Sequence, residues 1–102
     1  MCRRFHGHFG AYTSVSLANL TFRGSSEPSW YQSSDSARRG FCSTCGASLF
    51  WQKKDSAEIA IAAGSLDEPT GLKTAGHIFT ADKGDYYDIE GEAPRWPGSK
   101  FN

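Results

Sequence analysis

The apolar residues of this chain fall in short runs rich in β-branched and aromatic side chains, and they do not recur for long at helical spacing. Gly, Ser, Pro and Asp separate the runs, a combination typical of an all-β protein. We therefore expect short antiparallel strands joined by turns. The expected strands are Phe9–Ser16, Leu20–Arg23, Ser29–Gln32, Ala37–Phe41, Ser48–Gln52, Glu58–Ala63 and Gly76–Phe79.

Two pairs of adjacent aromatic residues lie in these runs, Trp30 with Tyr31 and Phe50 with Trp51. Neighbours on a strand point to opposite faces of the sheet. We expect one member of each pair to enter the core and the other to face outward.

The composition indicates one domain over residues 1–102, with 11 basic and 11 acidic residues. That length suits a single core, and balanced charge gives no basic face for nucleic acid. No apolar run approaches the ~20 residues of a membrane span, and residues 1–10 lack the apolar region of a signal peptide. We expect a cytoplasmic protein, in which three cysteines favour metal ligands or reactive thiols over disulfides.

Cys42 and Cys45 have the spacing of a zinc knuckle between two expected strands. Cysteines two residues apart can turn both sulfurs to one side, and the amides between them can donate to the sulfurs. Gly46 follows and supplies a residue able to adopt positive φ. A structural zinc site needs four ligands, and Cys2 is the one other thiol in the sequence.

Three other interpretations of this pair stay open. A redox-active pair would normally begin a helix, and no helical pattern follows Cys45. A disulfide is disfavoured by the reducing compartment. Two buried thiols without chemistry are the simplest alternative, because free cysteine is often buried.

Five segments, in order along the chain, carry a more specific signal. They are CRRFHGHFGAY (Cys2–Tyr12), EPSWYQSSDSARRGF (Glu27–Phe41), RGFCSTCGASLFW (Arg39–Trp51), IAIAAGSLDEPTGLK (Ile59–Lys73) and GHIFTADKGDYYDI (Gly76–Ile89). Through these segments the sequence resembles the glutathione-dependent formaldehyde-activating family.

This resemblance implies an Mss4-like fold, a β-tent of stacked antiparallel sheets with a zinc knuckle. It implies one structural and one catalytic zinc ion, each held by cysteines. It also implies carbon–sulfur lyase-type chemistry, the condensation of formaldehyde with glutathione to S-(hydroxymethyl)glutathione. Glutathione or a related small thiol is then the expected partner.

Carried over residue by residue, the resemblance assigns Cys42 and Cys45 to the later half of the structural zinc site. Cys2, followed by Arg3 and Arg4, matches the last cysteine of the catalytic segment. The other expected cysteines would precede Met1, so we expect an N-terminally incomplete domain. Its structural zinc site would be incomplete and its catalytic zinc site lost, which would impair activity.

Four residues near the N-terminus are weak candidates for substrate binding. Arg3 and Arg4 can pair with the carboxylates of glutathione, although a solvated strand edge is an equal alternative. His6 and His8 can line the pocket or ligate zinc with Cys2, but an ordinary pair on one face of an extended segment is favoured. For Arg38 and Arg39 the solvated strand edge is favoured over carboxylate binding.

The expected absence of N-terminal strands would leave a sheet edge uncovered, which favours a homodimer. Two copies could share one zinc through the paired Cys42 and Cys45 thiolates. A non-catalytic zinc-fold module that binds a partner is the alternative function, and a redox protein is a third.

Overall fold

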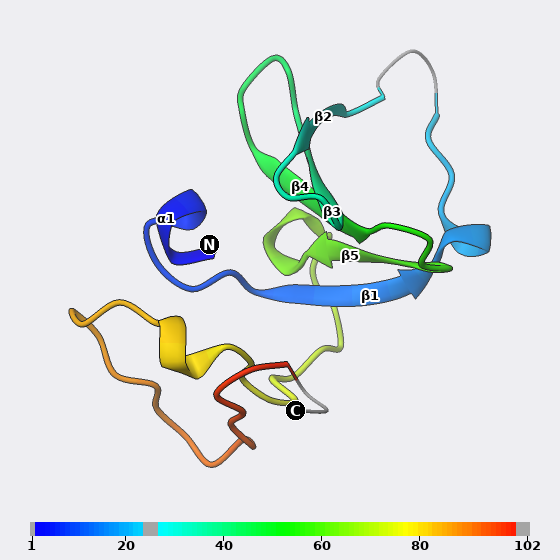
Figure 1. The fold of residues 1–102 in the computed structure, drawn as a ribbon. Coiled ribbons are helices and arrows are strands. Elements are labelled where there is room, and N and C mark those ends of the chain that lie inside the picture. The colour runs from blue at the N-terminus through cyan, green and yellow to red at the C-terminus, as the bar shows by residue number, and fades with distance from the viewer. Residues whose placement is uncertain (1, 24–26, 100–102) are drawn as a thin grey trace. The chain divides into compact units, whose positions relative to one another are not determined.

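The computed structural model describes residues 2–23 and 27–99 (Figure 1). Its helices and strands, in chain order, are α1 (Cys2–His6), β1 (Tyr12–Ser16), η1 (Leu17–Asn19), β2 (Ser29–Gln32), β3 (Ala37–Phe41), β4 (Ser48–Lys53), β5 (Glu58–Ala62), η2 (Ala63–Ser65) and η3 (Thr80–Asp82), where η denotes a 3-10 helix.

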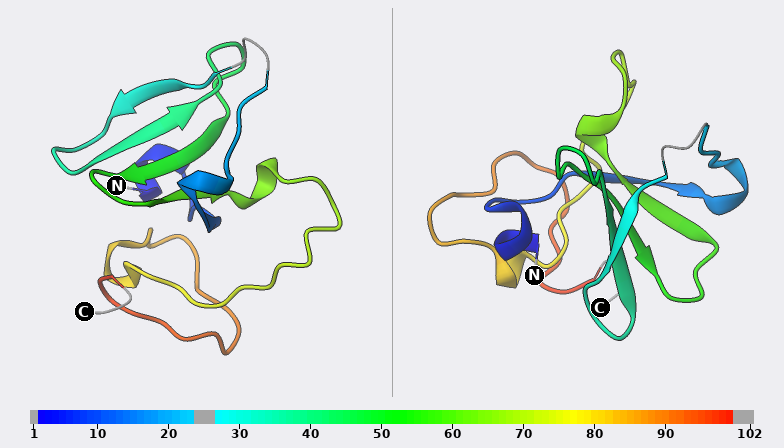
Figure 2. Two further views of the ribbon diagram at one scale, coloured as in Figure 1. Left: turned by 90° about the vertical axis from the view of Figure 1, so that its right-hand side faces the viewer. Right: turned by 90° about the horizontal axis from the view of Figure 1, so that it is seen from above.

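The strands form one antiparallel sheet in the order β1-β5-β4-β3-β2 (Figure 2). Strands β2 to β5 pair with their sequence neighbours, and β1 closes on β5 at one edge. The prediction of an all-β fold is confirmed. All strands of the described residues belong to this single sheet, and the stacked second sheet of a β-tent stays a prediction.

The core lies on one face of the sheet, around the buried side chains of Phe50, Ile59 and Ile61. Phe50 pairs directly with Ile61, and Ile59 lies two residues away, so the three share a face. Around them pack the half-buried side chains of Val15, Leu20, Trp30, Leu49 and Leu66. The predicted alternation is confirmed for Trp30, which packs on the core, and Tyr31, which is 53 % exposed. Phe50 is in the core as expected, but Trp51 is half-buried.

Most of the expected strands are present. Strands β2 and β3 have the expected bounds, and β1, β4 and β5 differ from prediction only at their ends. Residues 20–23 form no strand, although Leu20 still packs on the core. Residues 76–79 contribute a single bridge from His77 to Arg95 instead of a strand.

The N-terminal segment corrects a further expectation. Residues 2–6 form the short helix α1, and Gly7 follows at φ 75°. His6 and His8 therefore do not lie on one face of an extended segment. The chain turns between them, because Gly7 adopts the left-handed conformation open to glycine.

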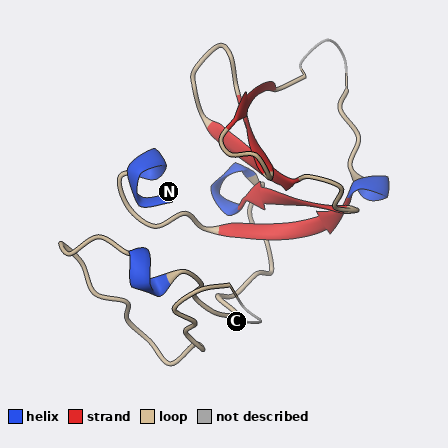
Figure 3. Cartoon of the chain, in the orientation of Figure 1, coloured by secondary structure: helices blue, strands red, loops and turns tan. Residues whose placement is uncertain are grey.

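The chain divides into two compact units. One consists of residues 11–67 and contains the sheet, and the other combines residues 1–10 with residues 68–102. In the second unit, the stretch after residue 67 consists mainly of loop, with η3 as a short interruption (Figure 3).

The segment around Pro94 and Pro97 is extended but not loose. Trp96 donates its amide to the His77 carbonyl at 2.8 Å, and the His77 amide donates to Pro94 O at 2.8 Å. Phe79 donates to Gly98 O at 2.7 Å. These hydrogen bonds fix the segment against residues 77–81.

Within the described part of the chain, no helix has the length and apolar character that crossing a membrane requires.

Candidate functional site

The knuckle predicted at Cys42–Gly46 is a tight turn between β3 and β4. The Cys42 amide donates to Ala47 O at 2.9 Å, and the Gly46 amide donates to Cys42 O at 2.7 Å. Gly46 has φ 79°, the left-handed conformation expected of it. The turn thus returns the chain into β4 with both cysteines on one short loop.

The backbone of this turn acts on the Cys42 sulfur. Hydrogen bonds from the amide of Cys45, and next from that of Thr44, hold the pKa of the Cys42 thiol below its ordinary value. Amide donors stabilise the thiolate, the form that binds metal and attacks electrophiles. The knuckle therefore favours the ionised sulfur that a zinc site requires.

The geometry bears on the alternatives for this pair. A strand, β4, follows Cys45 where a redox pair would begin a helix. Both thiols are free, and Cys45 is exposed, so two inert buried thiols do not describe the loop. Among residues 2–23 and 27–99, no group of three or more His, Cys, Asp or Glu side chains is placed to hold a metal ion. The donor set fits two ligands of a four-ligand zinc site.

The N-terminal candidates lie in and after α1. The side chains of Cys2 and Arg3 are outside the part of the chain that the structure describes. Arg4 is exposed on the helix, and His6 is half-buried with its ring edge-to-face against Phe5 at 5.1 Å. His8 is exposed beyond the turn.

His8 meets aromatic residues from the distant end of the sequence. Its ring lies edge-to-face against Tyr87 at 4.1 Å and near Tyr86 at 6.3 Å. The Tyr86 hydroxyl donates to Gly7 O at 2.6 Å and holds the two segments together. Lys83 adds a cation 5.2 Å over the Tyr87 ring. Sequence reasoning missed Tyr86 and Tyr87 as neighbours of His8, because no local pattern links residues about 80 positions apart.

Arg38 and Arg39 do not form a solvated strand edge. Their strand, β3, is interior because β2 pairs along its outer side. Arg39 is 2 % exposed. Arg38 is half-buried, with its guanidinium 3.8 Å from the Trp30 ring centre and hydrogen-bonded to Gln52. The prediction failed because strand order cannot be read from either arginine alone.

Residues 1–82 match the family described as "Glutathione-dependent formaldehyde-activating enzyme". The chain belongs to this family. No curated protein matches the chain closely enough to count as a relative.

The match to the formaldehyde-activating family spans the sheet, the knuckle cysteines and the N-terminal candidates. It ends at Asp82, before Lys83 and the two tyrosines that contact His8. Membership of the formaldehyde-activating family therefore rests on the sheet and the knuckle, and not on this aromatic neighbourhood.

Proposed function

We propose that this protein takes part in the condensation of formaldehyde with glutathione to S-(hydroxymethyl)glutathione. The observation that carries the proposal is the family match over residues 1–82. In this reaction the glutathione sulfur bonds to the formaldehyde carbon, and the carbonyl oxygen receives a proton. The protein's contribution would be to favour the thiolate and to hold the peptide near the carbonyl.

The cofactor that we propose is zinc, with Cys42 and Cys45 as two ligands of a structural site. The lowered pKa of Cys42 and the shared turn support this assignment, because zinc binds thiolates. Two further ligands would come from outside the knuckle, either elsewhere in the protein or from a second copy. A structural zinc ion supplies folding free energy, so its removal should destabilise the sheet.

For the reaction itself we propose Cys2 as a ligand of a catalytic zinc ion. Such an ion, when bound, lowers the pKa of a coordinated thiol or water. Arg3 and Arg4 would bind substrate carboxylates through their guanidinium groups. His6 and His8 would border the substrate. The Tyr87 ring packs against His8 and restricts its orientation.

The 102 residues provide three thiols for the two metal sites. We propose that a polypeptide of these residues alone has impaired activity, since loss of chelating ligands lowers metal affinity steeply. The free thiols of Cys42 and Cys45 also suit a reducing compartment, and we propose a cytoplasmic location.

The test is an NMR measurement of S-(hydroxymethyl)glutathione formation from 13C-formaldehyde and glutathione, with the zinc-loaded 102-residue protein. We expect a rate little above the uncatalysed one, with any excess lost in Cys2→Ser. The control Ser43→Ala changes a knuckle residue that is not a ligand and should not alter the rate. Robust turnover by this polypeptide would refute the impairment, and turnover unchanged in Cys2→Ser would refute the role of Cys2. A protein that also carries the further zinc-binding thiolates should exceed the uncatalysed rate. If it does not, the proposed function is refuted.

A further inference from the structure

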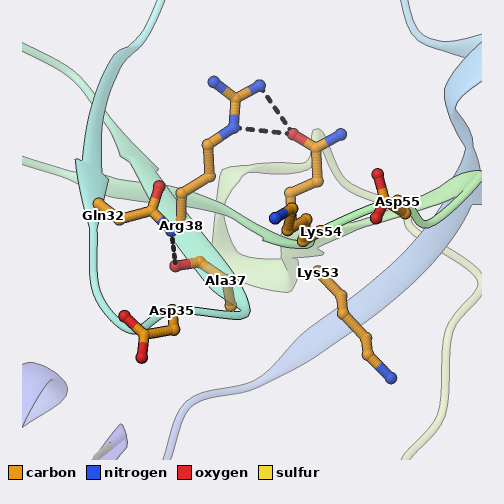
Figure 4. A pocket seen from close by; sticks show the side chains of 8 residues that line it. Gln32, Asp35, Ala37, Arg38, Lys53, Lys54 and Asp55 are labelled. Carbon is orange, nitrogen blue, oxygen red and sulfur yellow. Dashed lines mark hydrogen bonds between the residues drawn. The ribbon is translucent and has the colours of Figure 1, made fainter.

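A polar hollow lies where β2, β3 and β4 meet the turns that follow β2 and β4 (Figure 4). Its volume is about 390 Å³, toward the lower end of the roughly 300–1,000 Å³ typical of small-molecule sites. The residues lining it are Gln32, Asp35, Ala37, Arg38, Gln52, Lys53, Lys54 and Asp55. None of the metal or substrate residues proposed above belongs to it.

Arg38 is held in one orientation inside this hollow. Its Nε and Nη2 atoms donate to Gln52 Oε1 at 3.0 and 2.8 Å. The flat guanidinium also lies 3.8 Å from the centre of the Trp30 ring. One edge and one face are therefore occupied, which restricts the rotation of a normally flexible side chain.

The outer edge of the same guanidinium remains available. Within the part of the chain that the structure describes, Nη1 of Arg38 forms no hydrogen bond and Arg38 forms no ion pair. The Nη1–Nη2 edge carries two parallel N–H donors, the geometry that binds a carboxylate through both oxygens. An oriented arginine with this edge open is prepared to bind an anion.

Strand register places two amide side chains beside Arg38. Gln32 and Gln52 are its direct partners on β2 and β4, so the three form a row on one face. Because Oε1 of Gln52 accepts from Arg38, its Nε2 remains a donor. Gln32 donates from Nε2 to Ser34 O at 2.6 Å and Ala37 O at 3.2 Å, which leaves its Oε1 as an acceptor.

The charges around the hollow are balanced once Lys53 is set aside, since Arg38 and Lys54 stand against two carboxylates. The open edge of the oriented Arg38 guanidinium, and not an excess of positive charge, therefore attracts the anion. Lys54 continues beyond Gln52, with its amide bonded to Ser36 O at 2.7 Å. Lys53 pairs with Ala37 and so lies on the other face, and in Figure 4 its side chain extends away from Arg38.

We propose that this hollow binds the α-amino-carboxylate end of a γ-glutamyl thiol of the glutathione class. The carboxylate binds the Nη1–Nη2 edge of Arg38, with Gln52 Nε2 as a further donor. The ammonium group donates to Gln32 Oε1. The identity of this ligand rests on the function proposed above, whereas the anion-binding geometry of Arg38 does not.

The test uses S-methylglutathione, which lacks a free thiol and so binds without reacting. In a 15N NMR titration we expect shifts of the Arg38 Nε–H and Gln52 side-chain amide signals. An analogue with an amide in place of the γ-glutamyl carboxylate should bind at least about tenfold more weakly, since it loses a charge-assisted pair. Amidation of the glycine carboxylate should leave the shifts at Arg38 and Gln52 in place, because that carboxylate does not bind in this hollow.

Gln52→Glu is the decisive variant. Its carboxylate accepts the same hydrogen bonds from Arg38, so the fold is kept, but it neutralises the arginine. We expect the Kd for S-methylglutathione to rise at least about tenfold. Lys53→Gln, which removes a cation on the other face, is the matched control and should change the Kd less than about twofold.

The outcomes separate the two proposals. Shifts confined to other residues, or a Kd unchanged in Gln52→Glu, would overturn the Arg38 site even if S-(hydroxymethyl)glutathione is formed. Binding at Arg38 would support the site even without product formation, because the 102-residue polypeptide is expected to be impaired; the proposed reaction stands or falls by the rate measurement given above.

Discussion

At the scale of single residues, Gly40 and Gly46 are required for different physical reasons. Gly46 has φ 79°, so a side chain there would strain the turn after Cys45. Gly40 is buried on β3 without positive φ, and a Cβ there would lie 3.0 Å from Phe50 Cδ2 and 3.1 Å from Trp30 Cζ3. One glycine provides a backbone conformation, and the other provides space for the core.

Gly40→Ala should therefore destabilise the sheet by about 1–3 kcal/mol, because an extra methyl overpacks the contact between Phe50 and Trp30. Urea denaturation measures the change. Gly64→Ala is the control, since a Cβ at Gly64 meets nothing within 4 Å. A Gly40→Ala protein as stable as the control would show that the two rings do not constrain this position.

The Cys42 thiol should react with iodoacetamide at lower pH than an ordinary thiol, because its pKa is lowered by the amides of Cys45 and Thr44. The measurement uses a Cys2→Ser/Cys45→Ser protein without metal, in which Cys42 is the remaining thiol. We expect a midpoint below that of an ordinary thiol in the folded protein and a rise toward the ordinary value in urea.

The lowered pKa of Cys42 also determines how the free energy of unfolding changes with pH. A depressed folded pKa means that the unfolded state binds more protons between the two pKa values. Stability should then increase with pH across that interval and be lost as pH falls through the folded pKa. Identical reaction midpoints in buffer and in urea would contradict this account.

The knuckle was predictable residue by residue because its determinants are local. Cys42, Cys45 and Gly46 lie within one turn, and their spacing specifies the conformation. The environment of Arg38 was not predictable. Its partners Trp30 and Gln52 reach it through strand register, which a single sequence does not specify.

At the scale of elements, the strands that pair with sequence neighbours were predicted best. Strands β2, β3 and β4 have clear alternation and short connecting turns, so their bounds follow from pattern. Residues 20–23 and 76–79 have similar patterns but no ladder to join. Leu20 packs on the core without a strand, and His77 forms one bridge to Arg95. A β-rich run becomes a strand only when tertiary structure gives it a partner.

The bridge between His77 and the C-terminal segment depends on Gly76. A Cβ at this glycine would approach Trp96 Cζ3 to 2.5 Å and Pro94 O to 3.2 Å. Gly76→Val should displace Trp96 and weaken the hydrogen bonds between His77 and Trp96. We expect hydrogen exchange at these two amides to accelerate at least about tenfold, with Ala75→Ser as control. Unchanged exchange would show that Trp96 is not what secures the segment.

At the scale of the whole molecule, the sheet has two edges, β1 and β2. An unpaired edge can join another chain, and Tyr31 on β2 is exposed. We predict a homodimer that binds half a zinc ion per chain through the paired Cys42 and Cys45 thiolates. Light scattering measures the number of chains in the assembly, and metal analysis measures the zinc bound per chain. Tyr31→Lys should dissociate the dimer if β2 is the interface, whereas Ser14→Lys on β1 should not.

A monomer with one zinc ion per chain would contradict the shared-metal dimer. A dimer that persists in Tyr31→Lys but dissociates in Ser14→Lys would move the interface to β1.

The unit formed by residues 1–10 and 68–102 can assemble only after its second segment has been synthesised. All pairings of the sheet lie within residues 11–67, whereas the Tyr86 hydroxyl bonds to Gly7 across 79 positions. During synthesis the sheet can be complete while residues 2–10 still lack their partners, because those partners follow residue 67 and are made later. The turn that holds Cys42 and Cys45 is thus complete first, and the neighbourhood of His8 becomes structured only after the last third of the polypeptide has been synthesised.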